Sequence, residues 1–335
     1  MSKRNASPSA FGWDFQVNAA IVLMLDNIEQ AKAVRVEGET EDIEIFMSNG
    51  KKIYSQVKSV VKSSSDFSKV KEKMQDALAS LADAYANGDS EQLIYITNSP
   101  NPFNDKTTMN MFHGLAVRDF DSLPDKCKNK ILAMLKKIGQ DEIFATSQLI
   151  IRTIPFETDN LEERYKEIKQ KIDDFVYSVI PSSSGIGKEI MGIWQKDLFH
   201  NATLQNTKYV ISKKEMIWSI IVLITDIEKN ESEFMDDIDE CDYNEIVHMY
   251  KELINSYTER FDFATKVITD YTNYTYEGLR KDKLSNFVLT NWRSYISEFE
   301  YMNDDELTEQ LIKIILYNIL KQQRTISNIK KRVNL

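Results

Sequence analysis

The stretch Glu37–Lys58, EGETEDIEIFMSNGKKIYSQVK, decides the fold and carries most of the chemistry that this sequence offers. Two short runs of strand-forming residues, Asp42–Met47 and Lys52–Lys58, lie on either side of the turn-forming residues Ser48–Gly50. Strand-forming runs that flank such a turn are typical of a β-hairpin. The sequence therefore predicts a hairpin here.

The register of this hairpin follows from the length of its turn. A three-residue turn closed by Gly50 in the left-handed region places Ile43 opposite Ser55. Apolar side chains then share one face, and Asp42 lies across from Gln56 on the other. A two-residue turn would place Ile43 opposite Gln56 and mix polar with apolar side chains, which the two-residue period of a strand disfavours. The three-residue register is the prediction.

In this register, one acid, one amide and one lysine share a face of the hairpin. Asp42, the Gln56 side chain and the backbone carbonyl of Val57 supply the oxygen ligands that a hard cation such as Mg²⁺ prefers. Lys58 lies two residues beyond Gln56 on the same side and can position water or offset negative charge at a phosphate. This combination predicts metal-dependent cleavage of phosphodiesters.

The run from Asp42 to Gln56-Val57-Lys58 resembles the PD-(D/E)xK nuclease superfamily, in the variant where glutamine replaces the second acid. The sequence is more closely similar to the duplex-DNA endonuclease family of bacterial anti-phage defence, which in CBASS is fused to a SAVED domain. A similar nuclease is the effector subunit of Lamassu systems, which work with an SMC-like ATPase. The resemblance covers about the first two thirds of the chain. It is carried by the segments Phe11–Gln16, Val36–Ile43, Gln56–Lys58 and Ile211–Glu215.

This resemblance implies roles for individual residues. Asp42 and Gln56 would be ligands of Mg²⁺ or Mn²⁺, Lys58 the catalytic lysine, and Gln16 an auxiliary residue on the first helix. Three nearby acids could replace or assist Asp42, namely Glu37, Glu39 and Glu41. Without the other segments, the short Asp and Gln-x-Lys pattern would be an ordinary surface hairpin.

The net charge of −10 argues against a uniformly basic nucleic-acid binder. Residues 1–170 carry 22 Lys and Arg against 25 Asp and Glu, and residues 171–335 carry 20 against 27, so the acidity lies mainly in the second half. Lysines gather along the hairpin and the helix after it, where they can contact phosphates. The candidates for binding DNA are Lys51, Lys52, Lys62 and Lys69, and a solvated helix face is the alternative.

Composition also bears on the compartment and on metal sites. The two cysteines, Cys127 and Cys241, lack the spacing of a zinc site or of a disulfide scaffold. The first ten residues do not resemble a secretory signal, and no apolar run is long enough to cross a membrane. These features predict a cytoplasmic protein without membrane contact.

The pattern along residues 1–205 predicts an α/β nuclease domain, and the resemblance implies a restriction-endonuclease-like core with a mixed sheet flanked by helices. Residues 1–10 are expected to form a loose tail. Helices are expected over 11–30, from Ser63–Asp66 to residue 85, over 106–118, 125–137 and 160–180. Strands are expected over 34–37, 93–97 and 148–154 in addition to the hairpin.

Residues 206–335 are expected to form a helical domain for partner binding or oligomerisation. A Ser/Gly-rich linker at 182–188 fails as a phosphate-binding loop, because Ser182 replaces the first glycine and Glu189 follows the lysine. Helices are expected from Ser212 and over 243–263, 283–300 and 304–330, with their aromatic residues forming a core. Since a SAVED domain would alternate strands and helices, this pattern favours the Lamassu-like effector.

The sequence thus favours a double-stranded DNA endonuclease. It would be the effector of an anti-phage complex, silenced by an SMC-like ATPase and an accessory subunit and active as a homo-oligomer after release. Two other functions stay open. One is a structural subunit that keeps the nuclease fold without catalysis, and the other is a stand-alone restriction endonuclease of the Mrr type. The acidic helices of the second half speak against a base-reading domain.

Overall fold

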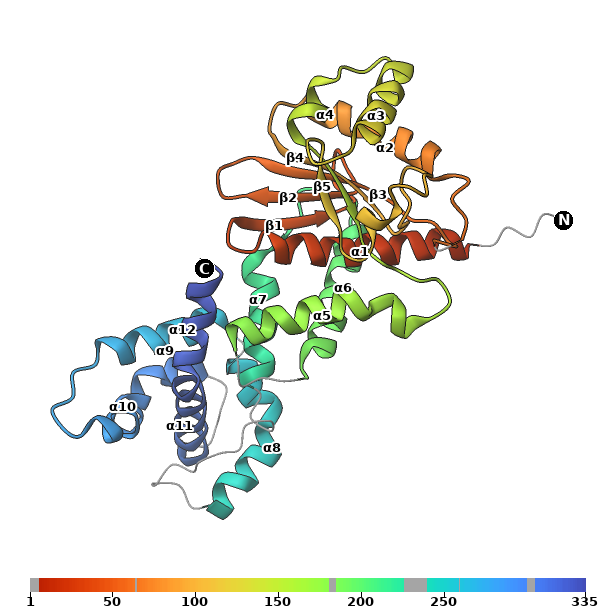
Figure 1. The fold of residues 1–335 in the computed structure, drawn as a ribbon. Coiled ribbons are helices and arrows are strands. Elements are labelled where there is room, and N and C mark those ends of the chain that lie inside the picture. The colour runs from red at the N-terminus through yellow and green to blue at the C-terminus, as the bar shows by residue number, and fades with distance from the viewer. Residues whose placement is uncertain (1–5, 64, 181–184, 226–239, 259, 300–304) are drawn as a thin grey trace. The chain divides into compact units, whose positions relative to one another are not determined.

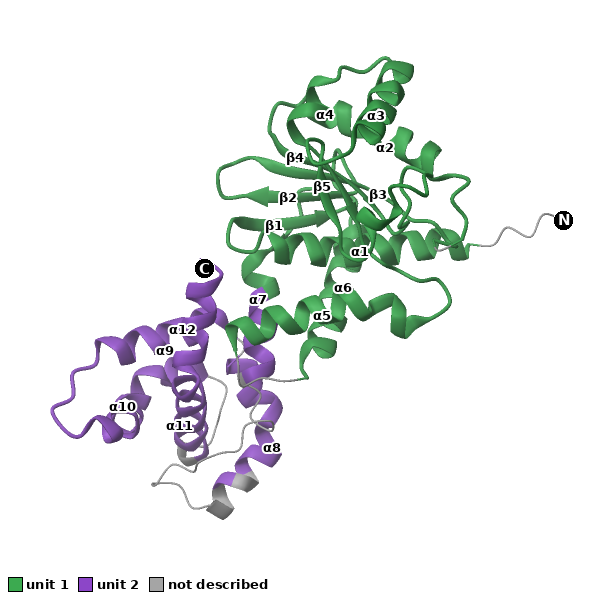
Figure 2. Ribbon diagram, in the orientation of Figure 1, with its two compact units in different colours: residues 1–216 green, residues 217–335 purple. Residues whose placement is uncertain are grey.

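The computed structural model describes residues 6–63, 65–180, 185–225, 240–258, 260–299 and 305–335. The chain divides into two compact units, residues 1–216 and 217–335 (Figure 2). The division falls within helix α7, Lys213–Thr225, and therefore after the boundary expected at residue 205. The two units are described separately below.

The first unit is an α/β domain built on an open sheet of seven strands, in the order β5-β6-β4-β3-β2-β1-β7. Strands β3, β4 and β6 are parallel to one another, and the remaining pairs are antiparallel, so the sheet is mixed. The strands are β1 (Ala31–Val36), β2 (Ile43–Met47), β3 (Lys52–Lys58), β4 (Ser90–Thr97), β5 (Val117–Asp119), β6 (Leu149–Thr153) and β7 (Ile211–Ser212).

Helices cover both faces of this sheet (Figure 1). One face carries α1 (Ser7–Asp26), α5 (Leu161–Val179) and α6 (Gly187–Thr203). The other carries α2 (Val70–Tyr85), α3 (Asp125–Ile138) and α4 (Ile143–Gln148). Because both faces are covered, the central strand β4 is an almost continuous buried run, as its apolar sequence predicts.

The hairpin of β2 and β3 has the predicted three-residue register. Ile43 pairs with Ser55, and Ile45 pairs with Ile53. Gly50 has φ 84°, which is the left-handed conformation that this turn requires. The backbone N–H of Met47 donates to the carbonyl of Lys51 at 2.9 Å and closes the turn. The pattern of side chains therefore fixes the pairing, as expected.

Three predictions about helix positions in the first unit are wrong. Helix α1 begins at Ser7, with a proline in its first turn, so residues 7–10 are helical and not part of the loose tail expected over residues 1–10. Helix α2 begins at Val70, because Asp66 accepts from the Ser68 N–H at 3.0 Å in a local turn and does not cap the helix. The expected helix over 106–118 is a short 3₁₀ helix, Met109–Phe112, followed by strand β5.

The second unit consists of helices around their own apolar core. They are α8 (Glu240–Thr258), α9 (Phe261–Asn273), α10 (Lys283–Asn291), α11 (Asp305–Lys321) and α12 (Gln323–Arg332), with 3₁₀ helices at Arg280–Asp282 and Trp292–Phe299. The predicted helices over 243–263, 283–300 and 304–330 are each interrupted. Aromatic residues pack in this core as expected, since Trp292 is buried and Trp218, Tyr257 and Tyr271 pack against it.

Three further predictions concern the start of α7, membrane spans and the linker over 182–188. Ser212 and Glu215 form the predicted capping box, in which the Ser212 N–H donates to Glu215 Oε2 at 2.7 Å and the Glu215 N–H donates to Ser212 Oγ at 3.1 Å. Within the described part of the chain, every helix is too short or too polar to cross a bilayer. The expected linker over 182–188 begins outside the described residues.

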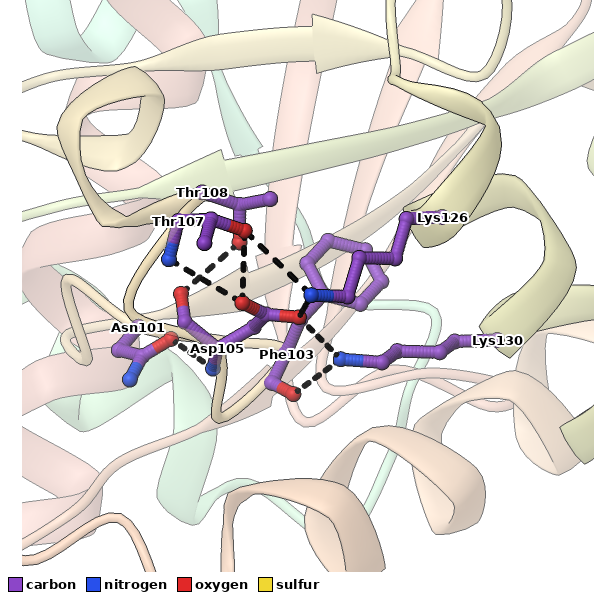
Figure 3. Close-up of polar contacts among 7 residues, drawn as sticks. All are labelled: Asn101, Phe103, Asp105, Thr107, Thr108, Lys126 and Lys130. Atoms are coloured by element: carbon purple, nitrogen blue, oxygen red, sulfur yellow. Dashed lines mark hydrogen bonds and ion pairs between the residues drawn. The ribbon is translucent and has the colours of Figure 1, made fainter.

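A loop after β4 is tied to α3 through Asp105 (Figure 3). Its Oδ2 lies 2.6 Å from Lys126 Nζ and 2.9 Å from Lys130 Nζ, and its Oδ1 accepts from Thr107. The hydrogen bonds from Lys126, Lys130 and Thr107 hold the pKa of this carboxyl well below its usual range. A depressed pKa means that the folded chain favours the ionised carboxylate.

Asp105→Asn should therefore lower the free energy of unfolding of the first unit at neutral pH, and this loss should be smaller in acid. An unfolded aspartate has a pKa of about 3.9, so the contribution of Asp105 is complete above that value and disappears as the pH falls toward the lower folded pKa. Urea unfolding of both proteins at pH 7 and through the range below about pH 4 measures this. The exposed Asp121→Asn serves as control, and a difference at Asp105 that stayed constant in acid would contradict the expectation.

Candidate active site

The loop between β1 and β2 brings three acids to one end of the hairpin. It is closed by two backbone hydrogen bonds, from the Glu37 N–H to the carbonyl of Asp42 at 2.8 Å and from the Gly38 N–H to the carbonyl of Glu41 at 2.9 Å. Glu37 has φ 53°, a left-handed conformation that costs a side-chain-bearing residue about 1 kcal/mol or more. The loop thus holds an unfavourable backbone conformation at an acidic residue.

A buried glutamate, Glu44, anchors this loop from strand β2. Its carboxylate accepts from the Thr40 N–H at 2.9 Å and pairs with Lys52 Nζ at 3.1 Å. A Cβ at Gly38 would lie only 2.5 Å from Glu44 Oε1, so a larger residue there would displace the carboxylate that anchors the loop. The loop conformation is therefore set by packing against the strand.

Asp42 is fixed against the neighbouring strand β3. Its Oδ2 accepts a hydrogen bond from the backbone N–H of Val57 at 2.8 Å. Burial raises the pKa of Asp42, and the Val57 hydrogen bond and the charge of Lys58 oppose that rise. Strand β3 thus both holds the Asp42 carboxylate, through Val57, and supplies the nearby positive charge of Lys58.

Glu41 occupies the position beside Gln56 that the sequence had assigned to Asp42. The Gln56 amide donates through Nε2 to Glu41 Oε2 at 2.9 Å, so the oxygen of that amide is not consumed by the bond. Glu41 is 4% exposed, and its Oε1 is buried without a hydrogen-bond partner. Burial, with the nearby charge of Asp42, raises the pKa of Glu41 to about 8. A buried oxygen without a hydrogen-bond partner requires an explanation, and a role as a cation ligand would supply one.

Gln16 on helix α1 lies beside two of the acids. Burial raises the pKa of Glu37, and the charge of Asp42 raises it further. Hydrogen bonding by the Gln16 side chain opposes this rise at both Glu37 and Asp42. The auxiliary residue predicted on the first helix is therefore next to the carboxyl groups.

Lys58 lies half-buried at the end of strand β3, where its charge acts on all three acids. It lowers the pKa of Glu37, Glu41 and Asp42 in each case against the effect of burial. Such coupling requires the ammonium group to be near all three carboxyls. The structure therefore brings together the predicted amide, lysine and acids at one end of the hairpin.

The remaining candidates lie elsewhere or at the margin. Glu39 is exposed in the loop. Lys51 and Lys52 lie at the opposite end of β3 from Lys58, about 20 Å away at 3.3 Å per residue. Lys52 is ion-paired with Glu44, whereas Lys62 and Lys69 are exposed in the segment before α2.

A second lysine, Lys73, lies near Lys58 and belongs to the lysine-rich stretch that the sequence analysis expected to contact phosphates. Lys73 of α2 hydrogen-bonds to the carbonyl of Ser59, the residue after Lys58. Burial lowers the pKa of Lys73, and the charges of Lys58 and Lys69 lower it further, so these three lysines lie close together. The sequence indicated a phosphate contact for the lysines of this helix start, but not that Lys73 lies beside the end of β3.

Arg35 on strand β1 supports the acidic loop, and the sequence analysis missed it. Its guanidinium group donates to the carbonyl oxygens of Asn201 at 2.5 Å, Leu204 at 2.6 Å and Tyr209 at 3.1 Å. Its Nε donates to the carbonyl of Glu37 at 3.2 Å. The sequence does place this arginine within an apolar strand. A charged side chain in such a buried position is expected to have partners.

The donor set fits a hard divalent cation. No three or more His, Cys, Asp and Glu side chains are arranged to hold a metal within the described ranges. Mg²⁺, however, keeps several waters and needs only one or two carboxylates. Asp42, the orphan Oε1 of Glu41 and the amide oxygen of Gln56 are oxygen donors of that kind, and Mn²⁺ accepts the same ligands.

Comparisons with protein-family models, with curated proteins and with solved structures found no match to this chain. The function proposed below therefore depends on the geometry and charge of the site.

Proposed function

We propose that this chain is a metal-dependent endonuclease that cleaves double-stranded DNA and has a restriction-endonuclease-like PD-(D/E)xK core. The observation that supports this most strongly is the convergence of Glu41, Asp42, Gln56 and Lys58 at one end of the hairpin. Buried carboxyls beside a lysine, with an amide oxygen available, are suited to a divalent cation and a phosphate.

Each residue has a distinct role in this proposal. Asp42, the Gln56 amide and the Val57 carbonyl would hold the cation, with Glu41 as a further ligand. A bound Mg²⁺ would supply Lewis-acid polarisation of the phosphoryl oxygen. Lys58 orients the attacking water or offsets charge in the transition state, since an ammonium aimed at developing charge is worth most in a buried site. Gln16 keeps Asp42 in position.

A plasmid assay tests this function with the full chain. We expect Mg²⁺ or Mn²⁺ to convert supercoiled plasmid to nicked and linear forms, and EDTA to abolish the conversion. The assay should cover a wide range of protein concentrations, because cutting both strands requires two active centres. Cleavage that persists in EDTA would contradict a metal-dependent centre. No cleavage at any concentration would favour a nuclease fold without catalysis.

We further propose that the chain is the effector of an anti-phage complex, kept inactive by an SMC-like ATPase and an accessory subunit. The second unit would bind these partners or other copies of the chain. In support, its described helices share an apolar core of their own, while Met249 and Leu279 are 62% and 65% exposed. Phage protection by cells that carry Asp42→Ala and Lys58→Ala variants tests the catalytic role, and protection that survives both would contradict it.

A further inference from the structure

A groove with a volume of about 510 Å³ lies between helices α2 and α3 on one face of the sheet. Lys71 and Gln75 line it from α2, and Lys130 and Lys137 line it from α3. Glu72 is the acidic side chain among its lining residues. The groove therefore carries more positive than negative charge.

Helix α3 concentrates positive charge in a chain whose net charge is −10. Its sequence DKCKNKILAMLKKI holds five lysines, at 126, 128, 130, 136 and 137, against the single Asp125. Cys127, Ile131 and Leu135 form the buried side of this helix, and the lysines lie at the surface or at its margin. Lys130 and Lys137 are two turns apart on the same side, about 10 Å along the helix axis.

The first turn of α2 connects this groove with the candidate active site. On one side of the turn, Lys73 hydrogen-bonds to the carbonyl of Ser59, directly after Lys58. On the other side, Lys71 lines the groove. Positive charge thus continues from the end of β3, across the start of α2, to the face of α3.

Some of these cations have partners within the chain. Lys130 is paired with Asp105 at 2.9 Å, and Lys137 donates to the neutral amide of Gln75 at 3.0 Å. Lys71 and Lys137 are both exposed. Their ammonium groups are therefore accessible to a polyanion in the groove.

We propose that the α2–α3 groove binds the sugar–phosphate backbone of duplex DNA and holds it beside the candidate active site. This inference rests on the proposed nuclease function and adds the surface that binds the substrate. Lysines that contact phosphates position a duplex independently of its base sequence. An acidic protein can bind DNA in this way because the charge is concentrated locally.

Duplex binding by the full chain tests the groove separately from cleavage. A fluorescent duplex is titrated in Ca²⁺ or EDTA at several salt concentrations, with wild type and the double variant Lys71→Gln/Lys137→Gln. We expect at least a 10-fold loss of affinity and a decrease of about 1.8 in the slope of log K against log salt, because each phosphate contact contributes about 0.9. The matched control is Lys166→Gln/Lys169→Gln on α5, where both lysines are exposed.

The outcomes distinguish this inference from the nuclease proposal. Equal binding by wild type and the groove variant would overturn the groove, even if wild type cleaves plasmid. Groove-dependent binding without any cleavage would support the groove and contradict the nuclease. A wild-type chain that does not bind the duplex at low salt would overturn both. Circular dichroism and thermal unfolding of each variant exclude misfolding as the cause of weak binding.

Discussion

Lys58→Ala should lower Mg²⁺-dependent plasmid cleavage by about 100-fold to 1000-fold while the chain stays folded. The lysine lies half-buried at the end of β3, and its charge reaches the carboxyls of Glu37, Glu41 and Asp42. The phosphoryl group carries more negative charge in the transition state than in the substrate. A fixed ammonium group therefore stabilises the transition state more than it stabilises the bound substrate. Initial rates of nicking at saturating Mg²⁺ measure the loss.

The control replaces another lysine of the same sheet. Lys32 is exposed on strand β1, and Lys32→Ala should cleave at the wild-type rate. Lys58→Arg keeps the charge but presents a planar group in place of a compact one, so partial activity is expected. Cleavage by Lys58→Ala at the wild-type rate would show that the chemistry takes place elsewhere on the chain.

The hairpin was predictable because two independent signals agree. The turn residues Ser48–Gly50 and the alternation of apolar side chains both select the same register, and a slip of one residue would turn every side chain to the other face. The run Leu93–Thr97 was equally clear, since a continuous apolar segment bounded by turn residues suits a strand covered on both faces.

The hydrogen-bond partners within the site could not be predicted from the sequence. Register places Asp42 across from Gln56, but the loop that begins at Glu37 brings Glu41 to the Gln56 amide and Asp42 to the Val57 N–H. That loop depends on a left-handed residue other than glycine, which sequence patterns do not indicate.

The predictions of helix boundaries were wrong for a related reason. Asp66 has the side chain of a helix cap, yet it accepts from Ser68 within a tighter local turn, and α2 begins only at Val70. Local hydrogen bonding by Asp competes with capping, and tertiary packing decides between the two. The predicted helix over 106–118 failed similarly, because strand β5 pairs with β6, and such pairing depends on residues far along the chain.

Arg35→Met should destabilise the first unit by about 3 to 5 kcal/mol. Arg35 is 1% exposed, and its guanidinium group hydrogen-bonds to the carbonyls of Asn201, Leu204, Tyr209 and Glu37. Methionine fills much of the volume but donates nothing. The carbonyls of Leu204 and Glu37 then lose this donor, at a cost of about 1 to 3 kcal/mol for each one left unsatisfied. The carbonyls of Asn201 and Tyr209 keep hydrogen bonds from the Leu204 N–H and the Asn201 side chain. Urea unfolding followed by circular dichroism measures the change.

Lys32→Met is the matched control, since it removes a cation from the same strand at an exposed position, and it should change stability by less than about 0.5 kcal/mol. Arg35→Lys should fall between the two, because one ammonium cannot replace donors that point at several carbonyls. Arg35→Met should also reduce cleavage under conditions where the protein is still folded, because the Glu37 carbonyl loses its anchor and the acidic loop loosens. An Arg35→Met protein as stable as Lys32→Met would mean that water satisfies these carbonyls equally well. Glu44 and the backbone hydrogen bonds within the loop would then be enough to hold the loop.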